Sequence, residues 1–169
     1  MEIKVPLENN YLPDQFSKYA SDKDKSSGTP IRSFPISLSE VPQGTKTLAI
    51  VMYDHDAIPV SGFTYIHWVA ANLDGSLREI PENASQSGQI PMTYGNNSTA
   101  GGLINNSDTR ISQHYNGPTP PDKPHRYTLL VYALDQKLPL KNGFWLNQFY
   151  DAAKGHILAQ AKQVILAKN

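Results

Sequence analysis

The chain has 169 residues, carries 15 Lys and Arg against 15 Asp and Glu, and contains no cysteine. This length predicts a single domain over residues 1–169, long enough to form a core without disulfides or a structural metal. The balanced charge argues against a dedicated nucleic-acid-binding protein, because neutralising phosphates requires a basic surface. The lack of cysteine excludes thiol catalysis and cysteine-ligated zinc or iron–sulfur sites.

No segment has the length and composition of a membrane span. The longest strongly apolar runs, Leu48–Tyr53 and Leu129–Leu134, have the length of a strand rather than of a spanning helix. The first five residues lack the apolar core of a cleaved signal peptide. We therefore expect a cytoplasmic protein without integral membrane association.

Apolar runs and alternation predict six strands. In chain order, these segments are Glu2–Leu7, Ile36–Leu38, Thr47–Tyr53, Thr64–Asn72, Leu77–Ile80 and Arg126–Leu134. Thr47–Tyr53, Thr64–Asn72 and Arg126–Leu134 are apolar on both alternating faces. Because a strand of that composition is covered on both sides, we expect these three to be central in a sheet.

The remaining segments are predicted as two loops and a helix. Lys18–Lys25 and Ser85–Ser112 are polar and poor in large apolar residues, and a loop as long as the second is often functional. A helix is expected from about Asn147 to Ala167, where apolar residues recur at spacings of 4, 4 and 3, namely Ala153, Ile157, Ala161 and Val164. The pattern is that of a mainly β (β-rich α+β) protein with a C-terminal helix, without the regular β–α alternation of a doubly wound sheet.

Candidate chemical groups gather at the ends of the predicted central strands. Asp54 and Asp56 directly follow the first of these strands, and His125 immediately precedes the third. His67 lies within the second, where alternation places it with Tyr65 and Val69. Each also has a plain structural explanation: aspartates in a turn, a core histidine bonded to a carbonyl, and a histidine at a loop boundary. Because groups at strand ends can converge, we expect Asp54, His67 and His125 to share one pocket.

The segment before His125 is stiff. It reads Gly117-Pro118-Thr119-Pro120-Pro121, and each proline fixes its own φ and restricts the preceding residue. Such a loop loses little conformational entropy when a ligand binds beside it. An ordinary turn between two strands is the alternative.

Several of these segments together match a known pattern. In order along the chain they are Asp54–Ala57 (DHDA), Ile66–Asn72 (IHWVAAN), Gly117–Pro121 (GPTPP) and His125–Tyr127 (HRY). This ordered set resembles the phosphatidylethanolamine-binding protein family, in its bacterial Raf kinase inhibitor-like branch. Val41–Lys46 and Ala153–Ala159 are similar to the same branch, and the resemblance extends from about Gly28 to Ala161.

The resemblance implies a Greek-key antiparallel β-sheet core with short flanking helices and a pocket for small anions, such as phosphate or phosphorylated head groups. The ligand-binding residues that it implies are Asp54, His67, Pro120, Pro121, His125 and Tyr127. It implies supporting positions for Asp56, Tyr115, Gly117 and Arg126, with an Asp56–Arg126 ion pair that braces the loops. Bacterial relatives look dimeric, so a homodimer is compatible with it.

Three other functions are considered, two of which use the same residues. An enzyme could employ Asp54, His67 and His125 in acid–base catalysis, but no Gly-x-Ser-x-Gly elbow, cysteine or phosphate-binding Gly-rich loop supplies a nucleophile or cradle. A metal site could use two histidines and a carboxylate, although short His spacings are absent. Relatives are reported to inhibit kinases or proteases, but nothing local identifies a protein partner. We expect an anion-binding protein that is not an enzyme and needs no cofactor or metal.

Overall fold

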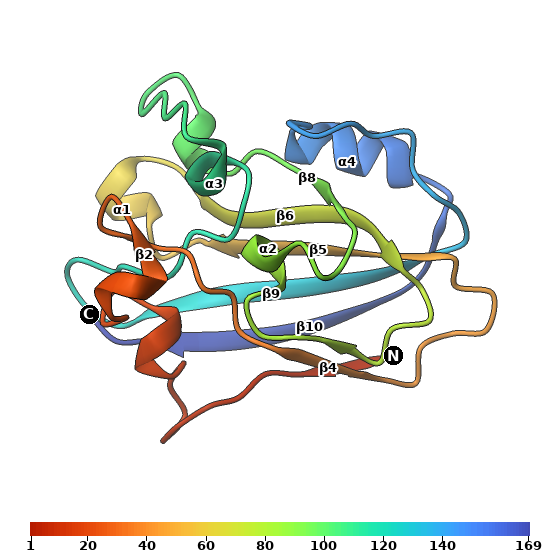
Figure 1. Ribbon diagram of the computed structural model, residues 1–169, viewed down its shortest axis with the longest axis horizontal. Coiled ribbons are helices and arrows are strands. Elements are labelled where there is room, and N and C mark those ends of the chain that lie inside the picture. The colour runs from red at the N-terminus through yellow and green to blue at the C-terminus, as the bar shows by residue number, and fades with distance from the viewer.

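A five-stranded antiparallel sheet forms the centre of the computed structural model, which describes residues 1–169 (Figure 1). Its strands lie in the order β10-β9-β5-β6-β8, and all neighbours are antiparallel. Their bounds are β5 Thr47–Asp54, β6 Tyr65–Asp74, β8 Thr93–Tyr94, β9 His125–Leu134 and β10 Ile157–Ala167. The three strands expected to be central, β5, β6 and β9, are the inner strands of this sheet.

A smaller sheet covers one face of the main one. It has the order β1-β4-β7, with β1 Glu2–Lys4, β4 Ile36–Ser39 and β7 Glu79–Ile80, which confirms the three predicted strands outside the central set. A two-stranded ribbon, β2 Lys25–Ser26 and β3 Thr29–Pro30, precedes β4. The mainly β architecture that the residue patterns predict and the antiparallel sheet that the resemblance implies are therefore present.

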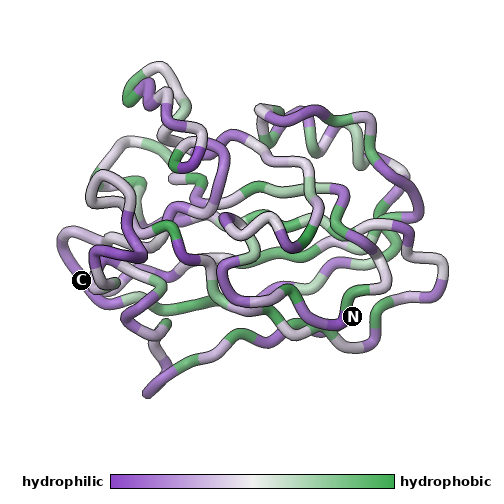
Figure 2. The backbone as a smooth tube through the Cα atoms, in the orientation of Figure 1, coloured by the Kyte–Doolittle hydropathy of each residue, from purple (hydrophilic) through white to green (hydrophobic).

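Both faces of the central strands are buried, which explains their continuous apolar sequences. Leu48, Ile50 and Met52 of β5 pack into the core shared with the smaller sheet. Ala49 and Val51 face the other way and pack with the helix α4, Leu146–Ala153. Figure 2 shows apolar residues along the strands of the sheet. Burial on both sides requires apolar residues at successive positions rather than at every second one.

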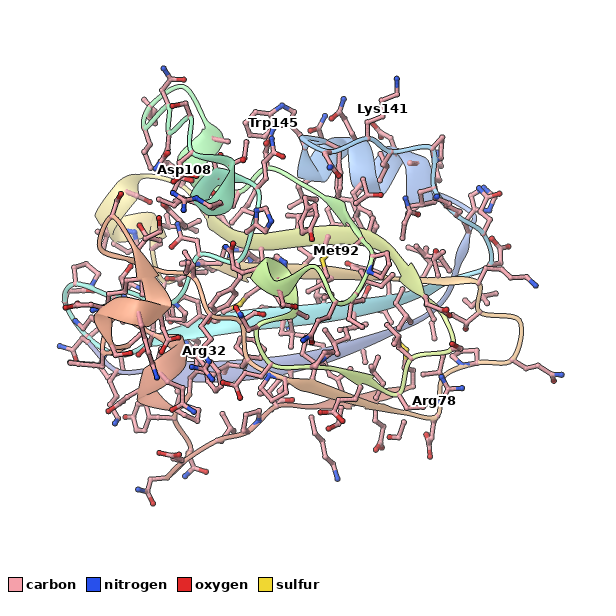
Figure 3. The ribbon with its side chains drawn as sticks, viewed as in Figure 1. Arg32, Arg78, Met92, Asp108, Lys141 and Trp145 are labelled. Carbon is pink, nitrogen blue, oxygen red and sulfur yellow. The ribbon has the colours of Figure 1, made fainter.

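The other helices are single turns at the periphery. Three are α-helical, α1 Ile58–Ser61, α2 Ala84–Ser87 and α3 Thr109–Ser112. Three are 3₁₀ turns, η1 Asp14–Phe16, η2 Asp22–Asp24 and η3 Ser98–Ala100. Asp108, labelled in Figure 3, caps α3 by accepting a 3.0 Å hydrogen bond from the backbone N–H of Arg110. No helix is both long and apolar enough to cross a membrane.

The expected helix from Asn147 to Ala167 is wrong over its last two-thirds. Helix α4 ends at Ala153, the chain turns through Gly155 at φ +82°, and β10 then pairs along β9. Ala161, Ile165 and Ala167 are buried, so the true period is two residues. Gln163 interrupts this pattern on the inner face and apolar residues lie on the outer one, which produced an accidental helical spacing.

The segment expected to be a long loop, Ser85–Ser112, contains most of α2 and all of β8, η3 and α3. The buried side chain of Asn97 organises it. The amide of Asn97 donates to the carbonyls of Ile111 and His114 at 2.6 and 2.9 Å, and its oxygen accepts from the backbone and hydroxyl of Thr99. These bonds supply the polar partners that a segment without a regular ladder needs.

Candidate functional site

The candidate side chains meet at one end of the main sheet because neighbouring strands are antiparallel. β5 ends at Asp54, opposite Tyr65 at the start of β6 and Tyr127 near the start of β9. Directly opposed residues project to the same face of a sheet. His125 precedes Tyr127 by two residues and shares that face. This end of the sheet lies beside α1 (Figure 1).

An irregularity in β6 brings His67 to the same place. Met52 pairs with Trp68 and Tyr53 pairs with Ile66, so the register skips His67, as in a β-bulge. The imidazole of His67 contacts the rings of Tyr65 and Tyr127, with centroids 4.9 and 5.0 Å away. The expected grouping of His67 with Val69 is wrong, because Val69 packs on the opposite face. The extra residue shifts the alternation, and nothing local in the sequence marks it.

His125 lies between two carboxylates. Its Nδ1 is 2.7 Å from Oδ2 of Asp54, and its Nε2 is 2.8 Å from Oδ1 of Asp122. Both ring nitrogens thus face carboxylate oxygens, an arrangement that favours the doubly protonated imidazolium. Burial alone lowers the pKa of His125, but the hydrogen bonds to Asp54 and Asp122 outweigh it and the pKa is raised.

His67 is in the opposite protonation state. Its Nδ1 donates to the carbonyl of Asn116 at 2.7 Å, and the backbone N–H of Asn116 donates back to the carbonyl of His67 at 3.0 Å. Burial lowers the pKa of His67 to about 4, against the opposing effects of Asn116 and Asp54. The ring is therefore neutral at pH 7. Its Nε2, which has no partner in the protein, presents a lone pair.

The two histidines line one cavity of about 210 Å³. The lining residues come from the end of β5, α1, the starts of β6 and β9, and the proline-rich loop, Gly117–Pro121. They are Asp54, Ala57, Val60, Ser61, Tyr65, His67, Thr119, Pro120, Pro121, His125 and Tyr127. Burial and the nearby Asp54 raise the pKa of Tyr127, so its hydroxyl remains a hydrogen-bond donor. The cavity thus combines a few polar groups with walls of tyrosine, proline and aliphatic side chains.

The proline-rich loop is fastened to the N-terminal segment. Lys18 donates from its backbone N–H to Pro118 O at 2.8 Å and from Nζ to Pro120 O at 2.9 Å. Gly117 lies outside the cavity but donates to Pro30 O at 2.8 Å. A Cβ at Gly117 would meet Phe16 O at 2.8 Å and Pro30 Cβ at 2.7 Å. Only glycine fits this approach, which positions the wall formed by the prolines.

The other supporting residues lie around the cavity and do not line it. The carboxylate of Asp56 accepts from the backbone N, Nε and Nη2 of Arg126 at 2.9, 3.0 and 2.8 Å, which joins the β5–α1 connection to β9. Tyr115 is fully buried and donates to Phe16 O at 2.6 Å. The structure thus contains the expected Asp56–Arg126 ion pair and places Tyr115 in the core.

Sequence reasoning missed the role of Asp122 and the contribution of Asn116. Asp122 precedes His125 by three residues, and that spacing was an available signal. Asn116 contributes through its backbone carbonyl, and a backbone contact cannot be predicted from the residue type. The lining by Val60 and Ser61 of α1 was also missed. No group of three or more His, Asp or Glu side chains in the structure is arranged to hold a metal ion.

Comparisons with known proteins agree with the fold and the motifs. The family model of the phosphatidylethanolamine-binding proteins matches residues 2–167. YxkA of Bacillus subtilis is 51% identical over 160 residues, covering 95% of each chain. CT736 of Chlamydia trachomatis, described as a homologue of these proteins, has a similar structure, with a TM-score of 0.76, 27% identity and coverage of 99% and 98% of the two chains.

YbcL of Escherichia coli shares the fold, with a TM-score of 0.76 at 21% identity over 99% of this chain and 98% of its own. The match of a whole-chain family model, the relative at 51% identity and the antiparallel architecture lead to one assignment. The chain belongs to the phosphatidylethanolamine-binding protein family.

Proposed function

We propose that the chain binds small phosphorylated molecules by their phosphate group, in the cavity lined by Asp54, His67 and His125. The observation that carries the proposal is the pair of imidazoles in complementary states within one cavity. His125 is charged and can donate, whereas His67 is neutral and can accept. A singly protonated phosphate ester has both an O–H donor and anionic acceptor oxygens, so it satisfies both rings.

The size of the cavity favours a head group. Its volume of about 210 Å³ is below the roughly 300–1,000 Å³ of sites for drug-sized ligands. A phosphate and a short polar substituent fit that volume, and a long acyl chain would remain outside. The family name supports a phosphorylated head group as one source of such a ligand, with free phosphate or a soluble phosphate ester as the other.

The hydroxyl groups in the cavity favour binding over hydrolysis. A serine or threonine nucleophile is normally hydrogen-bonded to the base that activates it. Ser61 Oγ instead lies 3.0 Å from each of the backbone carbonyl oxygens of Ala57 and Phe63, which share its one hydrogen. Thr119 Oγ1 makes no hydrogen bond to His67 or His125. The second candidate function, acid–base catalysis, has no comparable observation behind it.

Binding is expected to tighten as the pH falls from about 8 to 6. The raised pKa of His125 keeps it protonated above the ordinary histidine value of 6.5, and the proton is lost as the pH rises further. A phosphate monoester has its second pKa near 6. Lowering the pH therefore protonates the ligand, whose O–H can then donate a hydrogen bond to His67. It also keeps His125 charged.

Calorimetric titration with inorganic phosphate and O-phosphorylethanolamine at both pH values tests the proposal. We expect millimolar or tighter binding that is stronger at the lower pH and is lost in His125→Gln. His156→Gln is the matched control, because His156 is another histidine bonded to an aspartate, Asp135, at the opposite end of β9. Absence of binding by the wild type at both pH values would refute the proposal.

A further inference from the structure

Asp122 bonds to the ring nitrogen of His125 that the buried Asp54 leaves free, and Asp122 lies beside the cavity rather than among its lining residues. Its Oδ1 is 2.8 Å from Nε2, its side chain is 50% exposed, and that of His125 is 1% exposed. We propose that Asp122 is a tethered competitor, whose carboxylate takes the hydrogen-bonding position on His125 that an anionic ligand requires and must turn outward when the ligand binds. The inference rests on the proposed function and concerns what sets its affinity.

The other nitrogen of His125 offers no alternative. Nδ1 is bonded to Asp54, which is buried and whose second oxygen accepts from the backbone N–H of Ala57 at 3.2 Å. Nε2 carries a single hydrogen, and a phosphate oxygen and a carboxylate oxygen both need it as acceptors. An anion that bonds to His125 therefore has to replace Asp122.

The side chain of Asp122 can leave while the loop stays in place. The backbone of the loop is attached through Lys18 to Pro118 and Pro120, and Asn169 Nδ2 donates to the carbonyl of Asp122 at 3.3 Å. Besides His125, only the neighbouring backbone of Asp122 and Lys123 interacts with the carboxylate of Asp122. Rotation about its own side-chain bonds suffices to move this half-exposed group into water.

The local charge supports an exchange of one anion for another. His125 faces two carboxylates, Asp54 and Asp122, so the three groups together carry one negative charge, which repels a phosphate. With Asp122 turned outward, the negative charge of Asp54 and the positive charge of His125 cancel. The bound anion then replaces the negative charge that Asp122 has removed. The hydrogen bond to His125 lowers the pKa of Asp122, so it remains an anion and a competitor throughout the physiological range.

The test compares inorganic phosphate binding to the wild type, Asp122→Asn and Asp122→Ala at pH 6. An internal competitor lowers the apparent affinity for phosphate in proportion to the fraction of molecules in which Asp122 is turned outward. An ion pair at the surface favours the closed form, with Asp122 on His125, over this open form only several-fold. We therefore expect both variants to bind about three- to tenfold more tightly, with Asp122→Ala at least equal to Asp122→Asn because the amide oxygen can still accept from His125.

Asp135→Asn is the matched control. Asp135 is also half exposed, accepts from Nδ1 of His156 at 3.0 Å and lies beyond the far end of β9, so its substitution removes the same charge without opening the cavity. Its affinity for phosphate should equal that of the wild type. If the wild type binds phosphate and both Asp122 variants bind it equally or more weakly, the proposal that Asp122 competes is overturned and the proposed function stands. Failure of every protein to bind overturns the proposed function and the competitor together.

Discussion

Exchanging a phosphate ester for a sulfate ester examines the contact to His67. O-phosphorylethanolamine with one proton on its phosphate and ethanolamine O-sulfate have the same charge and nearly the same shape. They differ in that the phosphate carries an O–H and the sulfate carries none. The free Nε2 of neutral His67 can accept a hydrogen bond from the phosphate O–H. Against a sulfate oxygen, its lone pair faces another acceptor, and the two repel.

The size of the discrimination follows from the protonation costs. To donate to a sulfate at pH 7, His67 must first be protonated about three units above its pKa of about 4, a cost of about 4 kcal/mol at 1.36 kcal/mol per unit. The phosphate ester at that pH must gain its proton about one unit above a second pKa near 6, about 1.4 kcal/mol. The difference of two units predicts about hundredfold tighter binding of the phosphate ester.

Lowering the pH should narrow the gap. At pH 5 the cost for His67 falls to about one unit and the phosphate is already protonated, so about tenfold discrimination remains. Competition of the two esters, followed by calorimetry at both pH values, measures the ratio. In His67→Gln the side-chain amide can donate to either ester, and the ratio should approach one. Equal affinities for the two esters in the wild type at pH 7 would refute the assignment of His67 as an acceptor.

Three further substitutions test how the site is supported. Asp54→Asn leaves the buried His125 without its buried carboxylate, and urea unfolding should show a loss of about 2–4 kcal/mol; a loss below about 0.5 kcal/mol would contradict the buried pair. Arg126 lowers the pKa of Asp56 through hydrogen bonds and charge, so the stabilisation is present above the ordinary carboxyl value of 3.8 and is lost as the pH falls below it. The urea midpoint of Asp56→Asn should therefore lie below that of the wild type at pH 7, and the gap should narrow steadily as the pH falls below 3.8 toward about 2. A gap as wide at about pH 2 as at pH 7 would contradict the ion pair. Gly117→Ala forces a Cβ against the backbone of Phe16, so the free energy of unfolding should fall by about 2 kcal/mol and phosphate binding should weaken. Gly102→Ala, where a Cβ meets open space, should change neither. Equal behaviour of the two variants would contradict the close approach at Gly117.

Much of the fold was predictable because burial leaves a direct trace in sequence. Strands covered on both faces need continuous apolar runs, and β5, β6 and β9 show them. The meeting of Asp54 with His125 was also predictable, since antiparallel neighbours align the end of one strand with the start of the next. These features depend on residue types within one segment or on a simple rule of pairing.

Features that depend on distant contacts were not predictable. β10 carries an apolar spacing that fits a helix, and only its pairing with β9 makes it a strand. The bulge that turns His67 into the cavity comes from the register between β5 and β6. The lowered pKa of His67 comes from its burial in the folded chain, and its Nδ1 is held by the backbone of Asn116, 49 residues away. In each case the deciding partner is supplied by tertiary structure.

Nitrogen-detected NMR of the five histidines during a phosphate titration is the most direct measurement. We expect saturable changes in the ring nitrogens of His67 and His125, the two histidines that line the cavity. His55, His114 and His156, which lie elsewhere, should remain unchanged. No change at any histidine, or the same weak change at all five, would contradict a phosphate site in this cavity.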